Sequence, residues 1–186
     1  MPILTLMKRV NQKYANQSHP FINKNIALRR AYLTGVAMLA HADGDVDADE
    51  RSLFLSMAGA LEISEEMAAS ILNRAGESGE ETVLEIREHL YQSKYKYYFI
   101  VDLLLMAHQD QELKPVEDEV IRKFCELLGV EERDLQFLSD LAEALIEKDP
   151  EAKDRWTKEF FASMRMDPNP KPNDFLFYTS DDNFKA

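Results

Sequence analysis

The chain repeats one of its own segments, and this repeat is the feature that most constrains its fold. Residues 38–50, MLAHADGDVDADE, recur 67 residues later as LMAHQDQELKPVE over residues 105–117. Ala, His, Asp and Glu keep their places, and the register then holds without a gap as far as Glu65 and Glu132. A repeat of this kind predicts two copies of one supersecondary unit that pack together.

The composition favours an all-α fold. The 186 residues are 45% apolar and 30% charged, a globular profile with enough chain to bury a core. Ala, Leu, Glu, Met and Lys dominate, and these residues have high helix propensity. We therefore expect seven or so helices in two pseudo-repeated halves, a helical bundle.

Apolar spacing and capping residues place the expected helices. Asp47 with Glu50, and Ser78 with Glu81, have the spacing of capping boxes; Ser64 can cap a helix, and Pro115 suits a first helical position. The expected helices cover approximately residues 25–42, 47–61, 64–76, 78–92, 95–109, 115–129, 131–147 and 151–164.

Three parts of the chain differ in character. Residues 1–23 form an N-terminal lead, residues 24–165 the helical domain, and residues 166–186 a proline-rich linker and tail. Within the domain the repeat halves cover about residues 32–66 and 99–133. The tail carries an apolar patch, FLFY at residues 175–178, which either docks on the domain, binds a partner or precedes a further region.

Charge and cysteine content narrow the function. A net charge of −12 disfavours nucleic acid and anionic lipid as direct partners and favours cations or basic protein surfaces. The single cysteine, Cys125, reads as a core thiol in a reducing compartment. We find neither a signal peptide nor an apolar run of the ~20 residues that cross a bilayer, so we expect a cytoplasmic protein without membrane insertion.

The first copy of the repeat contains an acidic turn with five carboxylates in residues 43–50. Carboxylate oxygens are the ligands that Ca²⁺ and Mg²⁺ prefer. The turn is not an EF-hand, because the loop positions that require Gly and Glu hold Ala48 and Phe54. A cation site would either centre on this turn or be shared between the two copies. The predicted metal ligands are Asp43, Asp45, Glu50, Asp110 and Glu117.

The same acids have a structural explanation. Asp47 and Glu50 form a capping box, and Glu117 follows Lys114 at the same spacing in the second copy. Acids in the first turn of a helix gain roughly 0.3–1 kcal/mol from the helix dipole. Capping and cation binding do not exclude each other, so both interpretations stay open.

Other chemistry is sparse. His41 and His108 occupy matched positions and could bind a transition metal, but packing with one hydrogen bond is the simpler interpretation. Cys125 lacks the surroundings of a catalytic thiol. The tyrosine-rich stretch of residues 91–98 is interpreted as a helix junction between core and solvent. We expect no enzyme activity.

Both turns resemble a known signature. Residues 40–50, AHADGDVDADE, and residues 107–117, AHQDQELKPVE, are similar to the Ala-x-x-Asp-Gly-x-hydrophobic-(three residues)-Glu turn of the TerB-like families, although Gln111 replaces the glycine in the second copy. These families include the tellurite-resistance protein TerB and the N-terminal domain of the DjlA co-chaperones. The resemblance covers about residues 32–147.

The resemblance implies a function as well as a fold. It implies an all-helical domain of two pseudo-repeated halves, a bacterial stress response linked to tellurite and membrane-linked protein complexes, and a divalent cation at Asp43, Glu50, Asp110 and Glu117. The first hypothesis is therefore a non-enzymatic binding or scaffold protein that holds Ca²⁺ or Mg²⁺ and a protein partner. The alternatives are a metal-free protein–protein interaction module and, third, a metal-assisted hydrolase.

Overall fold

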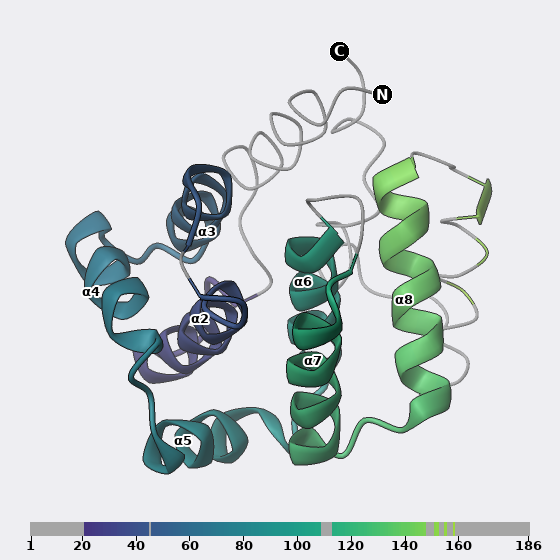
Figure 1. Ribbon diagram of the computed structural model, residues 1–186. Coiled ribbons are helices and arrows are strands. Elements are labelled where there is room, and N and C mark those ends of the chain that lie inside the picture. The colour runs from purple at the N-terminus through teal and green to yellow at the C-terminus, as the bar shows by residue number, and fades with distance from the viewer. Residues whose placement is uncertain are drawn as a thin grey trace.

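A computed structural model (Figure 1) describes residues 21–44, 46–108, 113–147, and residues 151, 152, 155 and 158. The described residues form helices joined by short turns, without a strand, which confirms the all-α prediction. The predicted apolar tail patch, and nearly all of the predicted N-terminal lead and of the helix at 151–164, lie outside these residues. The helices are α2 (Ile26–Ala40), α3 (Ala48–Ala60), α4 (Glu65–Ala75), α5 (Glu80–Leu90), α6 (Tyr95–Ala107), α7 (Pro115–Leu128) and α8 (Glu132–Glu147).

Side-chain caps fix the starts of several helices. Asn25 accepts a hydrogen bond from the Leu28 amide at 2.8 Å, and Ser64 accepts one from the Met67 amide at 3.3 Å. The predicted capping box at residues 78–81 is wrong. Gly79 is the N-cap of α5 and offers no side chain, while the Ser78 hydroxyl donates back to the Arg74 carbonyl oxygen at the end of α4. A serine this close to a preceding helix can bond the carbonyl four residues back instead.

The two predicted copies are two three-helix units. Helices α3 and α7 begin at Ala48 and Pro115, and helices α4 and α8 begin at Glu65 and Glu132, each pair 67 residues apart. Figure 1 shows α2, α3 and α4 as one group and α6, α7 and α8 as the other, with α5 across one end. Helix α2 packs against α6, so the first helix of each unit forms the junction between them.

In each three-helix unit, an equivalent basic residue binds a carbonyl oxygen at the C-terminal end of the second helix. Arg29 Nη1 donates to the Leu61 carbonyl oxygen at 2.7 Å, and Lys96 Nζ donates to the Leu128 carbonyl oxygen at 3.0 Å. Donor and acceptor are each 67 residues from their counterparts. A cation at a helix C-terminus satisfies carbonyls that lack an intrahelical partner and complements the helix dipole.

In the core between α2 and α6, matched positions of the two units hold different residues. The Tyr32 and Phe99 rings, which are repeat counterparts, meet edge to face with centroids 5.3 Å apart. The Tyr32 hydroxyl donates to the fully buried Asp102 carboxylate. Gly35, the counterpart of Asp102, faces Phe99 so closely that a Cβ atom would lie 2.5 Å from Phe99 Cζ. The close approach of the Phe99 ring therefore requires glycine at position 35, and the Tyr32 hydroxyl is matched by the Asp102 carboxylate.

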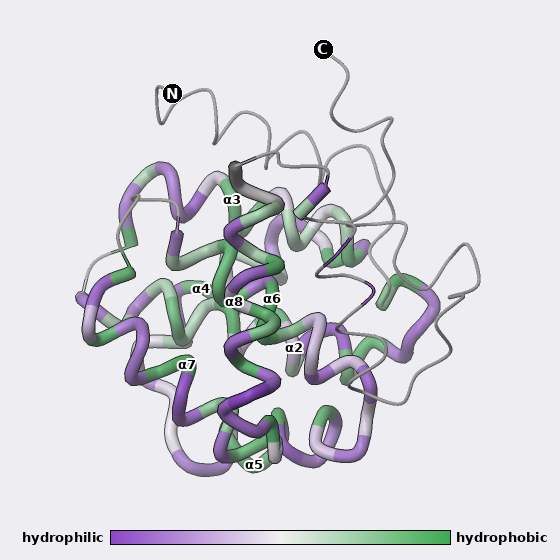
Figure 2. The backbone as a smooth tube through the Cα atoms, turned by 90° about the vertical axis from the view of Figure 1, so that its right-hand side faces the viewer, coloured by the Kyte–Doolittle hydropathy of each residue, from purple (hydrophilic) through white to green (hydrophobic). Residues whose placement is uncertain are grey.

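The other helices follow the usual two-sided pattern around this junction. Helix α6 is buried continuously from Tyr98 to Ala107. Helix α7 buries only one face, and Figure 2 shows hydrophilic and hydrophobic residues alternating along its tube. Since α6 is enclosed, the surface available for binding belongs to the turns and to the outer helices.

Candidate functional site: two joined acidic turns

The first acidic turn connects α2 to α3. Gly44 has φ +127°, a backbone conformation that favours glycine, and it lets the chain reverse after α2. The Asp47 side chain accepts hydrogen bonds from the Asp49 and Glu50 amides at 2.7 and 2.8 Å. Glu50 Oε2 in turn accepts from the Asp47 amide at 2.9 Å, which confirms the predicted capping box.

The second copy repeats half of this arrangement. Glu117 Oε2 accepts from the Lys114 amide at 2.9 Å, the counterpart of the bond between Glu50 and Asp47. Glu50 and Glu117 are 7% and 5% exposed, so the two retained glutamates are buried caps. The lysine that replaces Asp47 directs its side chain elsewhere.

Lys114 joins the two turns. Its Nζ atom lies 2.6 Å from Asp43 Oδ2, across a separation of 71 residues in the sequence. Both side chains are about one-third exposed, at 37% and 30%. The described parts of the two turns therefore meet in space, and the Lys114 ammonium lies between them.

Electrostatics at the junction favour a cation. Burial raises the pKa of Glu50, and the neighbouring Asp47 and Asp43 carboxylates raise it further. The hydrogen bond from the Asp47 backbone and the Lys114 ammonium lower the same pKa and offset part of this effect. Burial and like charge destabilise the ionised carboxylate, whereas a nearby positive charge stabilises it.

The predicted metal ligands are only partly described. Asp43, Glu50 and Glu117 lie in the described residues, whereas Asp45 and Asp110 lie outside them. Within the part of the chain that the structure describes, no group of three His, Cys, Asp or Glu side chains is placed to hold a metal ion. The five-residue set stays a prediction. Carboxylate oxygens are the donor type that Ca²⁺ and Mg²⁺ prefer, and the Asp43 carboxylate is paired with the Lys114 ammonium.

The two matched histidines belong to no group of three metal-binding side chains in the described residues. His41 Nε2 lies 2.8 Å from the Leu72 carbonyl oxygen. A carbonyl only accepts, so Nε2 carries the proton and is not available as a ligand. Burial lowers the pKa of His108, while the Glu143 charge opposes this shift. His41 thus matches the prediction of a packing residue with one hydrogen bond.

Cys125 is a buried thiol, and its surroundings disfavour the reactive thiolate. It is 5% exposed, and burial raises the pKa of its thiol to about 12. A reactive cysteine needs a thiolate, which forms when the pKa falls rather than rises. The result agrees with the predicted core thiol.

The tyrosine-rich stretch is a helix junction, as predicted. Tyr98 is 1% exposed and Tyr91 is 39% exposed, so the stretch crosses from the core to the surface. Lys96 lies 5.8 Å from the Tyr91 ring centroid and also bonds the end of α7. The Lys96 ammonium therefore has structural contacts within the domain.

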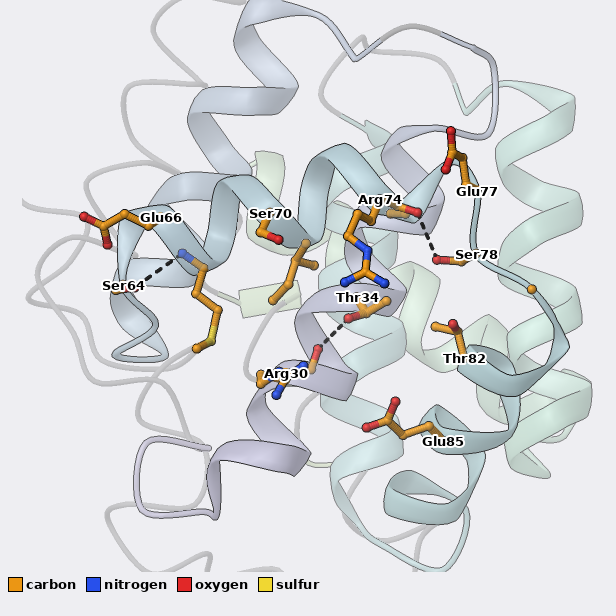
Figure 3. Close-up of a pocket in the computed structure, with 14 residues that line it drawn as sticks. Arg30, Thr34, Ser64, Glu66, Ser70, Arg74, Glu77, Ser78, Thr82 and Glu85 are labelled. Carbon is orange, nitrogen blue, oxygen red and sulfur yellow. Dashed lines mark hydrogen bonds between the residues drawn. The ribbon is translucent and has the colours of Figure 1, made fainter.

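Sequence reasoning missed a polar cavity of about 670 Å³ between α2, α4 and the start of α5 (Figure 3). Its wall includes two arginines, Arg30 and Arg74, one from each of two helices. No local motif marks the cavity, since its residues range from 30 to 85 and meet only in the folded chain. Hydroxyl and carboxylate groups complete the polar wall: Thr34, Ser78, Thr82 and Glu85.

Comparisons with known proteins agree with the turn signature. The model of the family described as "Tellurite resistance protein TerB" matches residues 29–140, more than half of the chain. No curated protein and no solved structure matches the chain. None of the described helices is long and apolar enough to cross a membrane. With its duplicated three-helix unit and its paired turns, the chain belongs to the TerB family of tellurite-resistance proteins.

Proposed function

We propose that this chain is a non-enzymatic binding protein of a bacterial, tellurite-resistance-like stress response. In this proposal the joined acidic turns are its cation-responsive surface. The observation that carries it is the 2.6 Å contact between Lys114 Nζ and Asp43 Oδ2, which brings the turns of the two copies together around a positive charge. Membership of the TerB family supports the link to stress response.

The proposed ligands are Asp43, Asp45, Glu50, Asp110 and Glu117, and the proposed ion is Ca²⁺ or Mg²⁺. A bound divalent cation would supply charge neutralisation of these clustered carboxylates. The chain's own residues determine the response. Lys114 competes for Asp43, and release of its ammonium exposes a positive side chain beside the turns. Both buried glutamates tie any such change to the first turns of α3 and α7.

The proposed partner is another protein, within a cytoplasmic assembly that includes membrane-linked stress components. The net charge of −12 favours a basic partner surface and disfavours nucleic acid. A lysine or arginine of such a partner could compete for Asp43 as Lys114 does.

A metal-free interaction module is the second candidate. One observation favours it: Lys114 already neutralises Asp43, and Glu50 and Glu117 each serve as a cap. In this case Lys114 is a permanent internal counter-ion. A metal-assisted hydrolase is third, because burial raises the pKa of the Cys125 thiol and His41 Nε2 is already bonded to the Leu72 carbonyl oxygen.

Thermal melts of the chelated full chain against Ca²⁺, Mg²⁺ and Mn²⁺, at fixed ionic strength, test the proposal. We expect one ion to raise the melting temperature by several degrees, because a ligand that binds only the folded state stabilises it. Asp43→Ala should abolish the shift. Glu119→Ala, which removes an exposed carboxylate paired with Lys123 on α7, should preserve it.

Lys114→Asp separates the two leading candidates. It gives the second turn the aspartate that the first turn has at Asp47 and removes the competing ammonium. A shift in the wild-type protein that increases in this variant supports the cation site. A rise in melting temperature seen only in the variant means that Lys114 replaces the ion. If no cation changes the melting temperature of either protein, the cation site is rejected and the metal-free module is favoured.

A further inference from the structure

The polar cavity between α2, α4 and α5 is separate from the acidic turns, since no residue of either turn lines it. Its volume, about 670 Å³, lies within the ~300–1,000 Å³ typical of small-molecule sites. The cavity is therefore large enough for a small organic ligand, and its wall chemistry indicates which kind.

Two guanidinium groups line the cavity together with three carboxylates. Figure 3 shows the Arg74 side chain directed from α4 across the opening toward Thr34 of α2. Arg30 lines the same opening one helical turn before Thr34. Neither arginine forms an ion pair with any described residue. Arginine binds carboxylate and phosphate through two parallel N–H donors, so this pair favours an oxyanion.

The start of α5 adds further donors at the same place. Gly79 is the N-cap of this 11-residue helix and provides no side chain to its first amides. The Thr82 hydroxyl lines the wall as a donor, whereas the Ser78 hydroxyl already donates to the Arg74 carbonyl oxygen. The positive end of a helix favours an anion, although Glu80 and Glu81 in the first turn of α5 offset part of this effect.

Three glutamates also line the cavity, and their positions limit their effect. In Figure 3 the Glu66 and Glu77 side chains point outward at opposite edges, whereas Glu85 points inward from α5. Glu85 is therefore the one carboxylate positioned to repel a bound anion. It can also accept a hydrogen bond from a ligand hydroxyl.

An apolar wall extends the site along α4. Met67 and Ile71 line it, and Met67 is 37% exposed. Met67 and Arg74 are seven residues apart on α4, a distance of roughly 10 Å at the helical rise. The cavity thus has an apolar end and a cationic end.

We propose that this cavity binds a small organic oxyanion, a phosphate- or carboxylate-bearing compound with an apolar part. Arg74 and Arg30 hold the oxyanion head, next to the N-terminus of α5. Met67 and Ile71 contact the apolar part. This site is independent of the cation-responsive turns and gives the protein a second ligand of opposite charge.

Titration of the ¹⁵N-labelled full chain with inorganic phosphate, acetate and phenyl phosphate, at constant ionic strength, tests the proposal. We expect saturable shifts of the Gly79 to Thr82 amides, and phenyl phosphate should bind at least about fivefold more tightly than phosphate because it adds apolar contact. Stronger binding of phosphate than of acetate would identify a phosphate compound, and the reverse would identify a carboxylate.

Variants test the assignment of the residues. Arg74→Gln should weaken phosphate binding about tenfold or more, as loss of a charge-assisted hydrogen bond does, and Arg30→Gln should weaken it less. Glu85→Gln should tighten binding severalfold. Arg51→Gln, which removes an exposed charge from α3 outside the cavity, should change binding less than twofold.

Three results would overturn the proposal. The first is no saturable binding of any probe up to about 20 mM, weaker than any specific site of this kind. The second is an equal loss of affinity in Arg74→Gln and Arg51→Gln, which indicates screening by net charge alone. The third is weaker phosphate binding by Glu85→Gln. Glu85 is exposed, so this variant should fold, and its result is independent of the arginine variants.

Discussion

The first and second halves of the molecule share their backbone plan but differ in the side chains at matched positions. Glu50 and Glu117 are both buried caps, and Arg29 and Lys96 both close a helix. In contrast, the lysine that bridges the turns and the carboxylate in the core each occur in one half only. Helix ends are thus the conserved element of the duplication, while the contacts between the halves have become asymmetric.

The strongest test of this asymmetry is Gly35→Ala. The added Cβ would lie 2.5 Å from Phe99 Cζ in the enclosed junction, so we expect a loss of about 3 kcal/mol in the free energy of unfolding. Gly59→Ala is the matched control, because its Cβ meets nothing within 4 Å and alanine favours helix. Urea unfolding of both variants measures the contrast, and equal effects would refute the close-contact explanation.

Asp102→Ala tests the other half of the junction. It removes an acceptor of the buried Tyr32 hydroxyl and leaves a small void, so we expect a loss of about 2 kcal/mol. Combining it with Tyr32→Phe should cost less than the sum of the two single variants, since the hydroxyl is removed as well. Strict additivity in this double-mutant cycle would show that the two side chains are not coupled.

The residues that follow α3 and α7, Glu62 and Gly129, allow the two halves to be compared by opposite substitutions. Both residues have positive φ, +51° and +63°, and they are repeat counterparts. Gly129→Ala should destabilise by about 1–2 kcal/mol, since alanine is strained there and its Cβ would lie 3.2 Å from Tyr91 Cε2. Glu62→Gly should stabilise by roughly 0.5–1 kcal/mol by relieving the same strain. Opposite signs in thermal melts are the expected result.

Glu50→Gln should have the smallest effect, visible in the pH dependence of stability. Burial raises the folded-state pKa of Glu50, so the folded protein binds this proton more tightly than the unfolded chain. Its contribution to stability is present at low pH and is lost as pH rises through the folded pKa, above 4.5. The variant should lose this part of the slope in urea unfolding between about pH 4.5 and 7. An unchanged slope would assign the pH dependence to other groups.

Much of the fold could be predicted because local signals determine it. Asp47, Ser64 and Pro115 start helices through interactions with the next few residues, and the 67-residue register gives the two units. The prediction at Ser78 failed since two helix ends compete for one hydroxyl, and sequence spacing alone does not decide between them.

The site was less predictable, because its contacts join distant parts of the chain. Nothing near Lys114 in the sequence indicates that its side chain reaches Asp43, which depends on how the halves pack. The cavity around Arg74 is likewise a product of three helices. The repeat register did hold one unused signal. It aligns Gly35 with Asp102, and such different residues at matched positions indicate that the two halves make different contacts there.

The unequal junction determines which halves can associate. If two first halves paired in this geometry, the Tyr32 hydroxyl would face glycine and lose its carboxylate partner. If two second halves paired, Asp102 would be buried against the Phe99 ring without the tyrosine donor. Both mismatches bury a polar group at a cost of about 1–3 kcal/mol. The Tyr32–Asp102 and Gly35–Phe99 contacts therefore favour packing of a first half against a second half and disfavour association of two like halves from neighbouring molecules.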